Sequence, residues 1–321
     1  MENTFSSELN KMHYAIQSWI RVRKIPNRPK SFFKYMTARV AKIVLVNQKL
    51  RWSSPLLFND PFDVQRDFDL GFDIEEIKKP LVNELLALVS AKKVPDLSRK
   101  PRVEYFVNRL RREDYGDIRN IIIRELPGLI DEGIQSAKNG YQQLKNKWSQ
   151  FIPHLRIFCL SEIPDSPLMW SHYSDSHKGV VVELEGLDSL DSAWLAAQPV
   201  TYQSSPPMLA TIPEWVKSIT GQQSIDLLSL LPKYACTKTP EWEYEKEWRV
   251  VFSRRRGDTG LYTDYAFNPQ ELRSVYLGCG VSDDDDNDIV SLLSYDFAHV
   301  KVYRGKKIQR DRKLSFTRIE R

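Results

Sequence analysis

The chain contains few cysteines for its length. Only three occur among 321 residues, at positions 159, 236 and 279, and no two of them form a C-x-x-C pair. An odd number of widely spaced cysteines argues against a disulfide framework and against a structural zinc site. Reduced thiols of this kind are typical of the cytoplasm, which is the compartment we expect. Cys159 lies in the apolar run RIFCL and is interpreted as a core residue, not as a nucleophile.

Long apolar runs are also missing. No window approaches the roughly 18 apolar residues that a membrane-spanning helix needs. The N-terminal segment lacks the uninterrupted apolar stretch of a signal peptide. We therefore expect a protein that is neither exported nor embedded in a membrane.

The signatures of several common enzyme classes are absent. The sequence has no G-x-x-x-x-G-K-[ST] phosphate loop, no G-x-G-x-x-G after a strand and no G-x-S-x-G nucleophile elbow. It has no H-E-x-x-H metal motif either. The acidic run at 283–286 lacks the spacing and the glycine of a calcium loop, so we interpret it as the first turn of a helix.

The composition is that of a globular protein. Hydrophobic residues make up 41% and charged residues 28%, which excludes global disorder, and the net charge of +5 is mild for a nucleic-acid binder. Basic residues nevertheless gather in runs, at 99–112, at 254–256 and in the tail from 306 to 321. Each run is either a solvated face or a phosphate-binding surface.

The expected elements define an α+β protein. Residues 1–30 are expected to form an N-terminal helical extension, with a helix at 7–23, and residues 31–321 a single domain with a helical insertion at about 73–150. A further helix is expected at 38–47, and prolines, Pro127 among them, are expected to separate the helices of the insertion. Strands are expected at 31–36, 50–53, 155–160, 179–184, 199–202, 234–237, 242–252, 262–267, 274–278 and 299–303. Because these strands do not alternate with helices, a mixed or antiparallel sheet is favoured over a doubly wound parallel one.

A first polar and aromatic cluster joins Lys34 and Tyr35 to the segment FNDPFD at 58–63. Asn and Asp side chains can bond nearby backbone amides while Pro61 fixes the chain direction, which predicts a rigid turn. The functional alternative is that this turn presents Asn59 or Asp63 to a ligand.

A second cluster follows Ser161 and runs through SPLMWSHYSDSHKG at 166–179. Ser166 or the preceding aspartate can cap a helix of about three turns that begins at Pro167. On such a helix Tyr173 and His177 share a face, whereas His172 and His177 are too far apart to share a metal ion. Packing of Trp170 and Tyr173 in a core explains the segment equally well.

A third cluster, WEYEKEWRVVF at 242–252, alternates with a period of two. We expect a strand with one buried face, formed by Trp242, Tyr244, Trp248, Val250 and Phe252. The opposite face then carries Glu243, Glu245, Glu247 and Arg249. Repulsion among three carboxylates should raise the pKa of at least one, while Arg249 keeps another ionised. Ordinary surface charges on an exposed strand face are the alternative.

Together these motifs, FNDPFD, LMWSHYSDSHKGVVVEL, W-x-YEKEWR and a late VYLG, resemble the bacterial domain-of-unknown-function family twenty-nine seventy-one. The resemblance covers about residues 33–303 and is weakest over the helical region. It implies a bacterial or phage-borne cytoplasmic protein and names no reaction.

The order of the clusters is also similar to that of ADP-ribosyltransferase-like proteins, which place a glutamate, often within Glu-x-Glu, on a late strand. That similarity implies NAD as substrate and a role as a toxin or an anti-phage defence effector. It would make Glu247 the catalytic carboxylate, Glu245 the group that orients the acceptor, and His172 or Tyr173 the stacking partner of nicotinamide. The remaining expected binding residues are Lys34, Tyr35, Asn59, Asp63, Ser161, Trp170 and Arg249. The chain departs from that pattern in having no clear His or Arg on the first strand.

Three hypotheses follow from the sequence. The first is an NAD-consuming ADP-ribosyltransferase-like enzyme acting on a protein or nucleic acid, and it requires the three clusters to meet in one cleft. The second is a metal-dependent nuclease that uses Glu245, Glu247, Asp63 and His172. The third is a non-enzymatic protein that binds a partner through its helical insertion.

Overall fold

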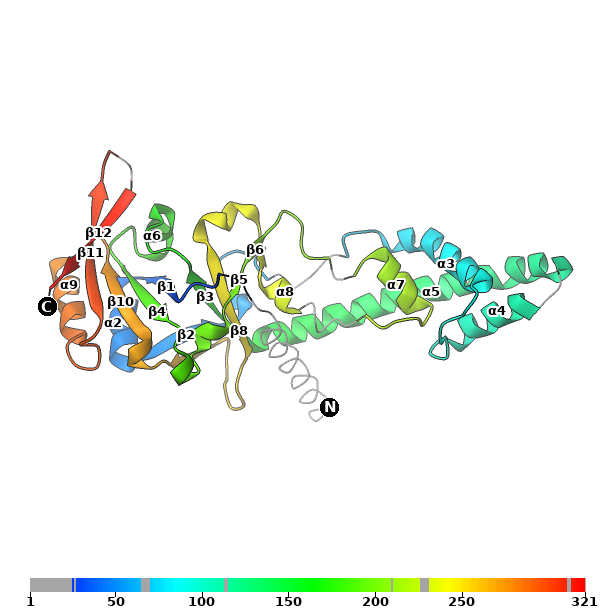
Figure 1. The fold of residues 1–321 in the computed structure, drawn as a ribbon, viewed down its shortest axis with the longest axis horizontal. Helices are drawn as coiled ribbons and strands as arrows, with labels where there is room; N and C mark the ends of the chain where they lie inside the picture. The colour runs from blue at the N-terminus through cyan, green and yellow to red at the C-terminus, as the bar shows by residue number, and fades with distance from the viewer. Residues whose placement is uncertain are drawn as a thin grey trace. The chain divides into compact units, whose positions relative to one another are not determined.

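The computed structural model describes residues 25, 27–64, 70–112, 115–208, 210–225, 231–310 and 313–320. The helix expected at 7–23 lies outside these residues. The chain divides into two compact units, and each is described by itself (Figure 1). The first unit comprises residues 1–65, 151–205 and 232–321, and the second comprises 66–150 and 206–231.

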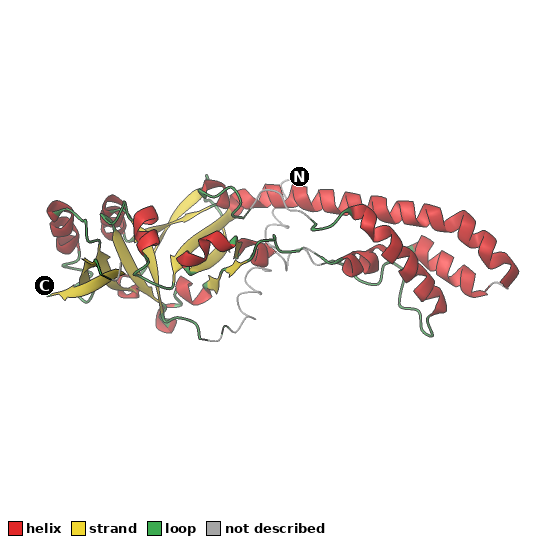
Figure 2. Ribbon diagram, turned by 90° about the horizontal axis from the view of Figure 1, so that it is seen from above, coloured by secondary structure: helices red, strands yellow, loops and turns green. Residues whose placement is uncertain are grey.

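The first unit is built on a large, mostly antiparallel sheet (Figure 2). The described strands follow the order β12-β11-β10-β4-β1-β3-β2-β9, with β8 also paired to β3, and β5 to β8. Their bounds are β1 Ser31–Met36, β2 Lys49–Ser53, β3 Leu155–Ser161, β4 Val180–Glu185, β5 Gln198–Pro199, β8 Glu247–Ser253, β9 Tyr262–Ala266, β10 Leu272–Leu277, β11 Lys301–Ile308 and β12 Lys313–Ile319. Only β10 and β11 are parallel neighbours in it. The expected α+β class with a mixed sheet is thus confirmed.

Helices cover both faces of this sheet. On one face, α2 (Ala38–Asn47) and α9 (Asp283–Leu292) pack beside one another over the main apolar core. Thr37 caps α2 by accepting a hydrogen bond from the Val40 amide, and Ser282 caps α9 by accepting one from the Asp285 amide. The acidic run at 283–286 forms the first turn of α9, as the sequence predicted. On the other face, α6 (Pro167–Tyr173) covers a smaller aromatic cluster that includes Tyr35 and Trp170.

The sheet opens on both sides of β3. Strands β1 and β3 share the single bridge between Phe33 and Ser161, although β1 pairs with β4 along its whole length. Strands β2 and β3 likewise share only the bridge between Ser53 and Ile157. Side chains of β1, β2 and β3 therefore face a gap in the hydrogen-bonded sheet, where a pocket can form. The short strands β6 (Thr201–Tyr202) and β7 (Thr237–Lys238) form a separate parallel pair.

The regular elements among the described residues of the second unit are all helices. It contains α3 (Lys78–Ser90), α4 (Pro101–Arg112), α5 (Tyr115–Phe151) and α7 (Ile212–Ile219), around a core with Leu81, Phe106 and Trp215. Residues 206–231 join this unit from a later part of the sequence, which the sequence analysis did not foresee. None of the described helices is both long and apolar enough to cross a membrane.

Three expectations about elements were wrong. The two helices expected on either side of Pro127 are one helix, α5, because buried residues such as Ile121 and Leu129 continue its apolar stripe past the proline. The strand expected at 234–237 begins as helix α8 (Leu231–Ala235). The strand expected at 242–252 is a 3₁₀ helix at Pro240–Glu245 followed by β8, because Lys246 has a left-handed φ of 44° that breaks the alternation.

The segment after α6 also differs from the expected long helix. Asp175, Ser176 and His177 all have positive φ, so α6 ends at Tyr173 and Tyr173 and His177 do not share a helix face. The His177 carbonyl accepts a hydrogen bond from the Gly280 amide. It also lies so close to Gly278 that a Cβ there would approach the carbonyl oxygen to 2.1 Å.

Replacing Gly278 by alanine should therefore destabilise the protein by at least about 2 kcal/mol, because backbone atoms would have to move to relieve the contact. Gly280→Ala is the matched control, since its added Cβ would meet the same oxygen at 3.4 Å. Urea unfolding of both variants measures the difference. Equal stabilities for the two variants would contradict the backbone packing described for this turn.

Candidate functional site

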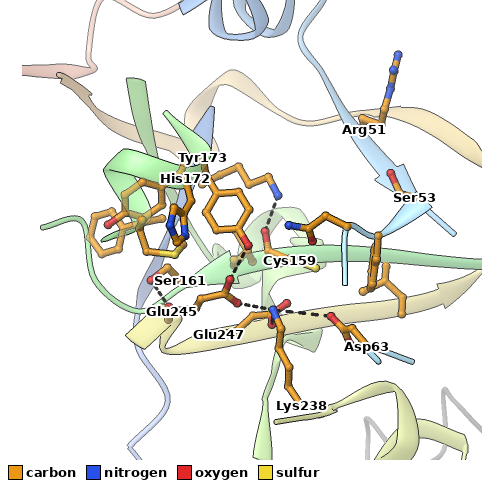
Figure 3. A pocket seen from close by; sticks show the side chains of 18 of the residues that line it. Arg51, Ser53, Asp63, Cys159, Ser161, His172, Tyr173, Lys238, Glu245 and Glu247 are labelled. Atoms are coloured by element: carbon orange, nitrogen blue, oxygen red, sulfur yellow. Dashed lines mark hydrogen bonds and ion pairs between the residues drawn. The ribbon is translucent and has the colours of Figure 1, made fainter. Parts of the chain in front are cut away.

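A pocket of about 420 Å³ lies in the first unit where the sheet opens (Figure 3). It is lined from β1, β2, β3, α6, β7, the 3₁₀ turn before β8, β8 itself and the loop after β2. Its lining residues are Phe33, Lys34, Tyr35, Arg51, Ser53, Leu57, Phe58, Asn59, Asp63, Ile157, Cys159, Leu160, Ser161, Met169, His172, Tyr173, Lys238, Glu245 and Glu247. The three clusters recognised in the sequence thus meet in one pocket.

The loop after β2 forms the rigid turn that was expected. The Asp60 carboxylate accepts a hydrogen bond of 2.8 Å from the Phe62 amide, and the Asp60 carbonyl accepts one from the Asp63 amide. This turn brings the Asp63 side chain into the interior, where it is buried. A polar side chain buried in this way needs a partner, and Arg249 provides it.

Arg249 lies on β8 and is completely buried, with 0% of its surface exposed. Its Nη1 and Nη2 donate to the two carboxylate oxygens of Asp63 at 2.8 and 2.6 Å, and its Nε and Nη2 donate to Glu247 at 2.8 and 2.9 Å. The remaining donor of Nη1 bonds the Ala235 carbonyl. Burial disfavours the charged guanidinium, but the Asp63 and Glu247 carboxylates outweigh burial and raise the pKa of Arg249.

Glu247 is the ionised carboxylate of the site. Burial favours its neutral form, but the charges of Arg249 and Lys238 dominate and lower its pKa to about 2. Both of its oxygens are already engaged, because Lys238 Nζ lies 3.3 Å from Oε2 in addition to the two bonds from Arg249. Tyr202 Oη accepts a hydrogen bond of 2.7 Å from the Glu247 amide, which fixes the start of β8.

The pKa of Glu245 is shifted in the opposite direction. Its burial and the neighbouring charge of Glu247 raise its pKa, against the opposing effect of Lys238. Tyr173 Oη donates to Glu245 Oε1 at 2.6 Å, and Lys238 Nζ donates to Oε2 at 2.6 Å. Figure 3 shows the Glu245 carboxylate between these two side chains. The pKa splitting predicted from the sequence is therefore present, with Glu245 raised and Glu247 lowered.

Lys238 is a pocket residue that was not predicted from the sequence. It is buried on β7 and contacts Glu245, Glu247 and, at 3.7 Å, Asp63. Burial opposes its charge, yet the two glutamates raise its pKa. Three carboxylates beside one arginine require a further cation, so the charge balance of the third cluster was the signal that could have indicated such a residue.

Residues from β1 and β3 form another wall of the pocket. Lys34 Nζ donates to the Cys159 carbonyl at 2.8 Å, and Tyr35 Oη donates to the Ile163 carbonyl at 2.8 Å. Ser161 Oγ donates to the backbone carbonyl of Glu245 at 2.7 Å, so its hydroxyl positions that glutamate. Burial raises the pKa of the Cys159 thiol, which keeps it protonated and unreactive.

Helix α6 supplies the remaining polar groups of the wall. His172 Nδ1 is 2.9 Å from Tyr244 Oη, and the imidazole is exposed at the rim. Burial, and then the charge of Glu245, raises the pKa of Tyr173, so this phenol stays a hydrogen-bond donor. The neighbouring Asn59 side chain opposes this rise in the pKa of Tyr173, and both residues line the pocket, which links the first cluster to the second.

Three expected residues are placed elsewhere. Trp170 and Arg249 do not line the pocket. The Trp170 side chain of α6 is fully buried in the aromatic cluster with Tyr35, and Arg249 is fully buried against Glu247. Glu243 is exposed in the 3₁₀ helix and pairs with Lys246, so it does not share a strand face with Glu245 and Glu247. Within the described ranges, no three His, Cys, Asp or Glu side chains are grouped so as to hold a metal ion.

The fold and the site together define an α+β protein whose pocket rests on a buried network of three carboxylates and two cations. Residues 169–250 match the model of the family described as "Protein of unknown function (DUF2971)". This match confirms the family assignment within those residues, which include most of α6 together with Lys238, Glu245, Glu247 and Arg249. Neither the curated proteins nor the solved structures contain a match to the chain.

Arg249→Met should lower the free energy of unfolding by about 3 to 5 kcal/mol, because Asp63 and Glu247 would remain buried without their common partner. Arg273→Met is the matched control, since Arg273 is 43% exposed and pairs with Glu185 near the surface. Its loss should cost at most about 1 kcal/mol. Similar urea midpoints for the two variants would show that the buried network does not support the fold.

Proposed function

We propose that the pocket binds NAD and that the protein transfers ADP-ribose from it to a protein or nucleic-acid acceptor. The observation that carries the proposal is the unequal pair of glutamates, one held ionised and one with a raised pKa, inside a pocket of about 420 Å³. Ligand pockets generally have volumes of about 300 to 1,000 Å³ and combine an apolar lining with a few polar groups, as this one does.

The charge of the network favours a cationic transition state. Asp63, Glu245 and Glu247 supply three negative charges, whereas Lys238 and Arg249 supply two positive ones, so ionisation of Glu245 leaves one negative charge in excess. Cleavage of the bond between ribose and nicotinamide places positive charge on the ribose as the bonding electrons leave with nicotinamide. Preorganised negative charge in a buried site stabilises such a state.

The structure favours Glu245 over Glu247 as the group that reacts. Glu247 is fixed by Arg249 and Lys238 through both oxygens, so its role is to keep the site negative. Glu245 has a raised pKa, which suits a base that takes the proton of the acceptor as the acceptor attacks ribose. Glu245 thus acts on the acceptor, as the resemblance implied, but the proton transfer that the resemblance did not assign is placed on Glu245, and Glu247 contributes charge alone.

The other pocket residues fit the rest of the dinucleotide. The Phe33, Tyr35 and Phe58 rings offer apolar surface for a planar ring. Lys34 Nζ donates to a carbonyl and lies 4.8 Å from the centre of the Phe158 ring, but it has no carboxylate partner among the described residues, so its charge is left to meet a phosphate of the dinucleotide. His172 lies at the rim, where an acceptor would enter.

A metal-dependent nuclease and a non-enzymatic binding protein are less well supported. The carboxylates that a metal ion would need, Asp63 and Glu247, are already paired with Arg249 and Lys238. A purely structural role does not explain why Glu245 faces a pocket with a raised pKa.

The test is release of nicotinamide from NAD by the purified protein, with cell lysate present to supply acceptors. Glu245→Gln should reduce release by about 10²-fold or more, because the base is lost while the shape of the side chain is kept. Glu243→Gln is the matched control, two residues away and exposed, and it should retain the wild-type rate. Absence of release by folded wild-type protein, or full release by folded Glu245→Gln, would contradict the proposal.

A further inference from the structure

The hairpin of β11 and β12 extends past the strand beside it. Pairing between β10 and β11 ends at Leu277 and Arg304, whereas pairing between β11 and β12 continues to Ile308 and Lys313. Residues 306–308 and 313–315 therefore form a two-stranded ribbon, hereafter the ribbon, which pairs with no third strand of the described chain. Figure 1 shows this hairpin rising beyond the end of β10.

Cations stand on both faces of the ribbon. Lys306 and Lys313 lie on one face, because their register partners are Ser315 and Ile308. Lys307, opposite Leu314, lies on the other face. Arg310 follows at the tip, and all four side chains are exposed.

These four cations have no carboxylate partner among the residues that the structure describes. Closer to the sheet, Arg304 pairs with Asp286 of α9, so the acidic start of that helix neutralises the base of the hairpin and not the ribbon. Residues 306–310 and 313–319 contain no acidic side chain, and the two residues between these ranges, Asp311 and Arg312, add one charge of each sign, so the sequence of the hairpin is strongly basic. Like charges in such excess repel one another, and they are stabilised when a polyanion binds.

The base of the ribbon is rigidly held. Phe316, the first β12 residue beyond the ribbon, packs 6.0 Å from Trp170 and 5.1 Å from Tyr276, measured between ring centroids. Tyr303 stacks on Tyr276 at 4.9 Å. An element anchored by aromatic packing loses little conformational freedom when its exposed end binds.

We propose that the ribbon binds duplex DNA by entering the major groove, with lysines from its two faces reaching the phosphates of the two groove walls. The major groove, about 12 Å wide and about 8.5 Å deep, admits a two-stranded β-ribbon. Three residue pairs give the ribbon a length of about 10 Å, which matches that depth. The proposal does not depend on NAD chemistry, because it concerns a surface outside the pocket.

Binding should depend steeply on salt. Contacts from four cations to phosphates predict a slope of about −3.6 for the logarithm of the association constant against the logarithm of salt concentration. Affinity should therefore fall about 100-fold between 50 and 200 mM NaCl.

The experiment measures fluorescence anisotropy of a labelled 30-base-pair DNA duplex with the full chain over that salt range. The double variant Lys306→Ser/Lys313→Ser should lower the slope by about 2, because two phosphate contacts are lost. Lys92→Ser/Lys93→Ser removes the same charge from exposed residues of the second unit and should leave the slope unchanged. Urea unfolding checks that both variants are folded.

Several outcomes would overturn the proposal. They are no binding of the duplex at 50 mM NaCl, equal losses in the two double variants, and binding to vesicles with 30% phosphatidylserine but not to DNA. Equal affinity for duplex RNA would also count against it, because the major groove of RNA is too narrow for the ribbon.

Discussion

The site depends on the buried contact of Arg249 with Asp63 and Glu247. All five donors of this guanidinium are used, four of them on carboxylates that come from separate parts of the chain. The contact fixes the loop after β2 against β8 and keeps Glu247 ionised in a buried position. Lys238 then joins Glu247 to Glu245. Each further member of the network thus depends on a charge that Arg249 holds in place.

The pocket and the network are consequences of the same interruption of the sheet. Because β3 shares only one bridge with β1 and one with β2, strands on both sides turn side chains toward the opening. Strand β8 pairs fully with β3 and supplies Glu247. The 3₁₀ turn before β8 supplies Glu245, and α6 supplies Tyr173. A carboxylate with a raised pKa is thereby placed in a cavity and supported on every side, which is the usual arrangement of a catalytic acid or base.

Local patterns in the sequence predicted much of this arrangement, but not its geometry. The apolar run at 179–184, the cap at Ser166 and the acidic run at 283–286 act locally, so the strand and the starts of both helices were found. The clusters were also found, since polar residues beside aromatic ones on strands are visible in any single sequence. The left-handed residue Lys246 was missed because the alternation resumes in the same phase at Trp248, so the single lysine on the apolar face did not indicate a break. Lys238 was missed because its partners are set by tertiary contacts.

One charged network shifts the pKa values of the two glutamates in opposite directions. The most direct measurement is an NMR titration of protein labelled with ¹³C at the glutamate carboxyl carbons, with the two signals assigned through Glu245→Gln and Glu247→Gln. The account predicts that the Glu245 signal titrates above the ordinary range of a glutamate, about 4.3, and that the Glu247 signal titrates well below it. Two signals that both titrate near the ordinary value would contradict it.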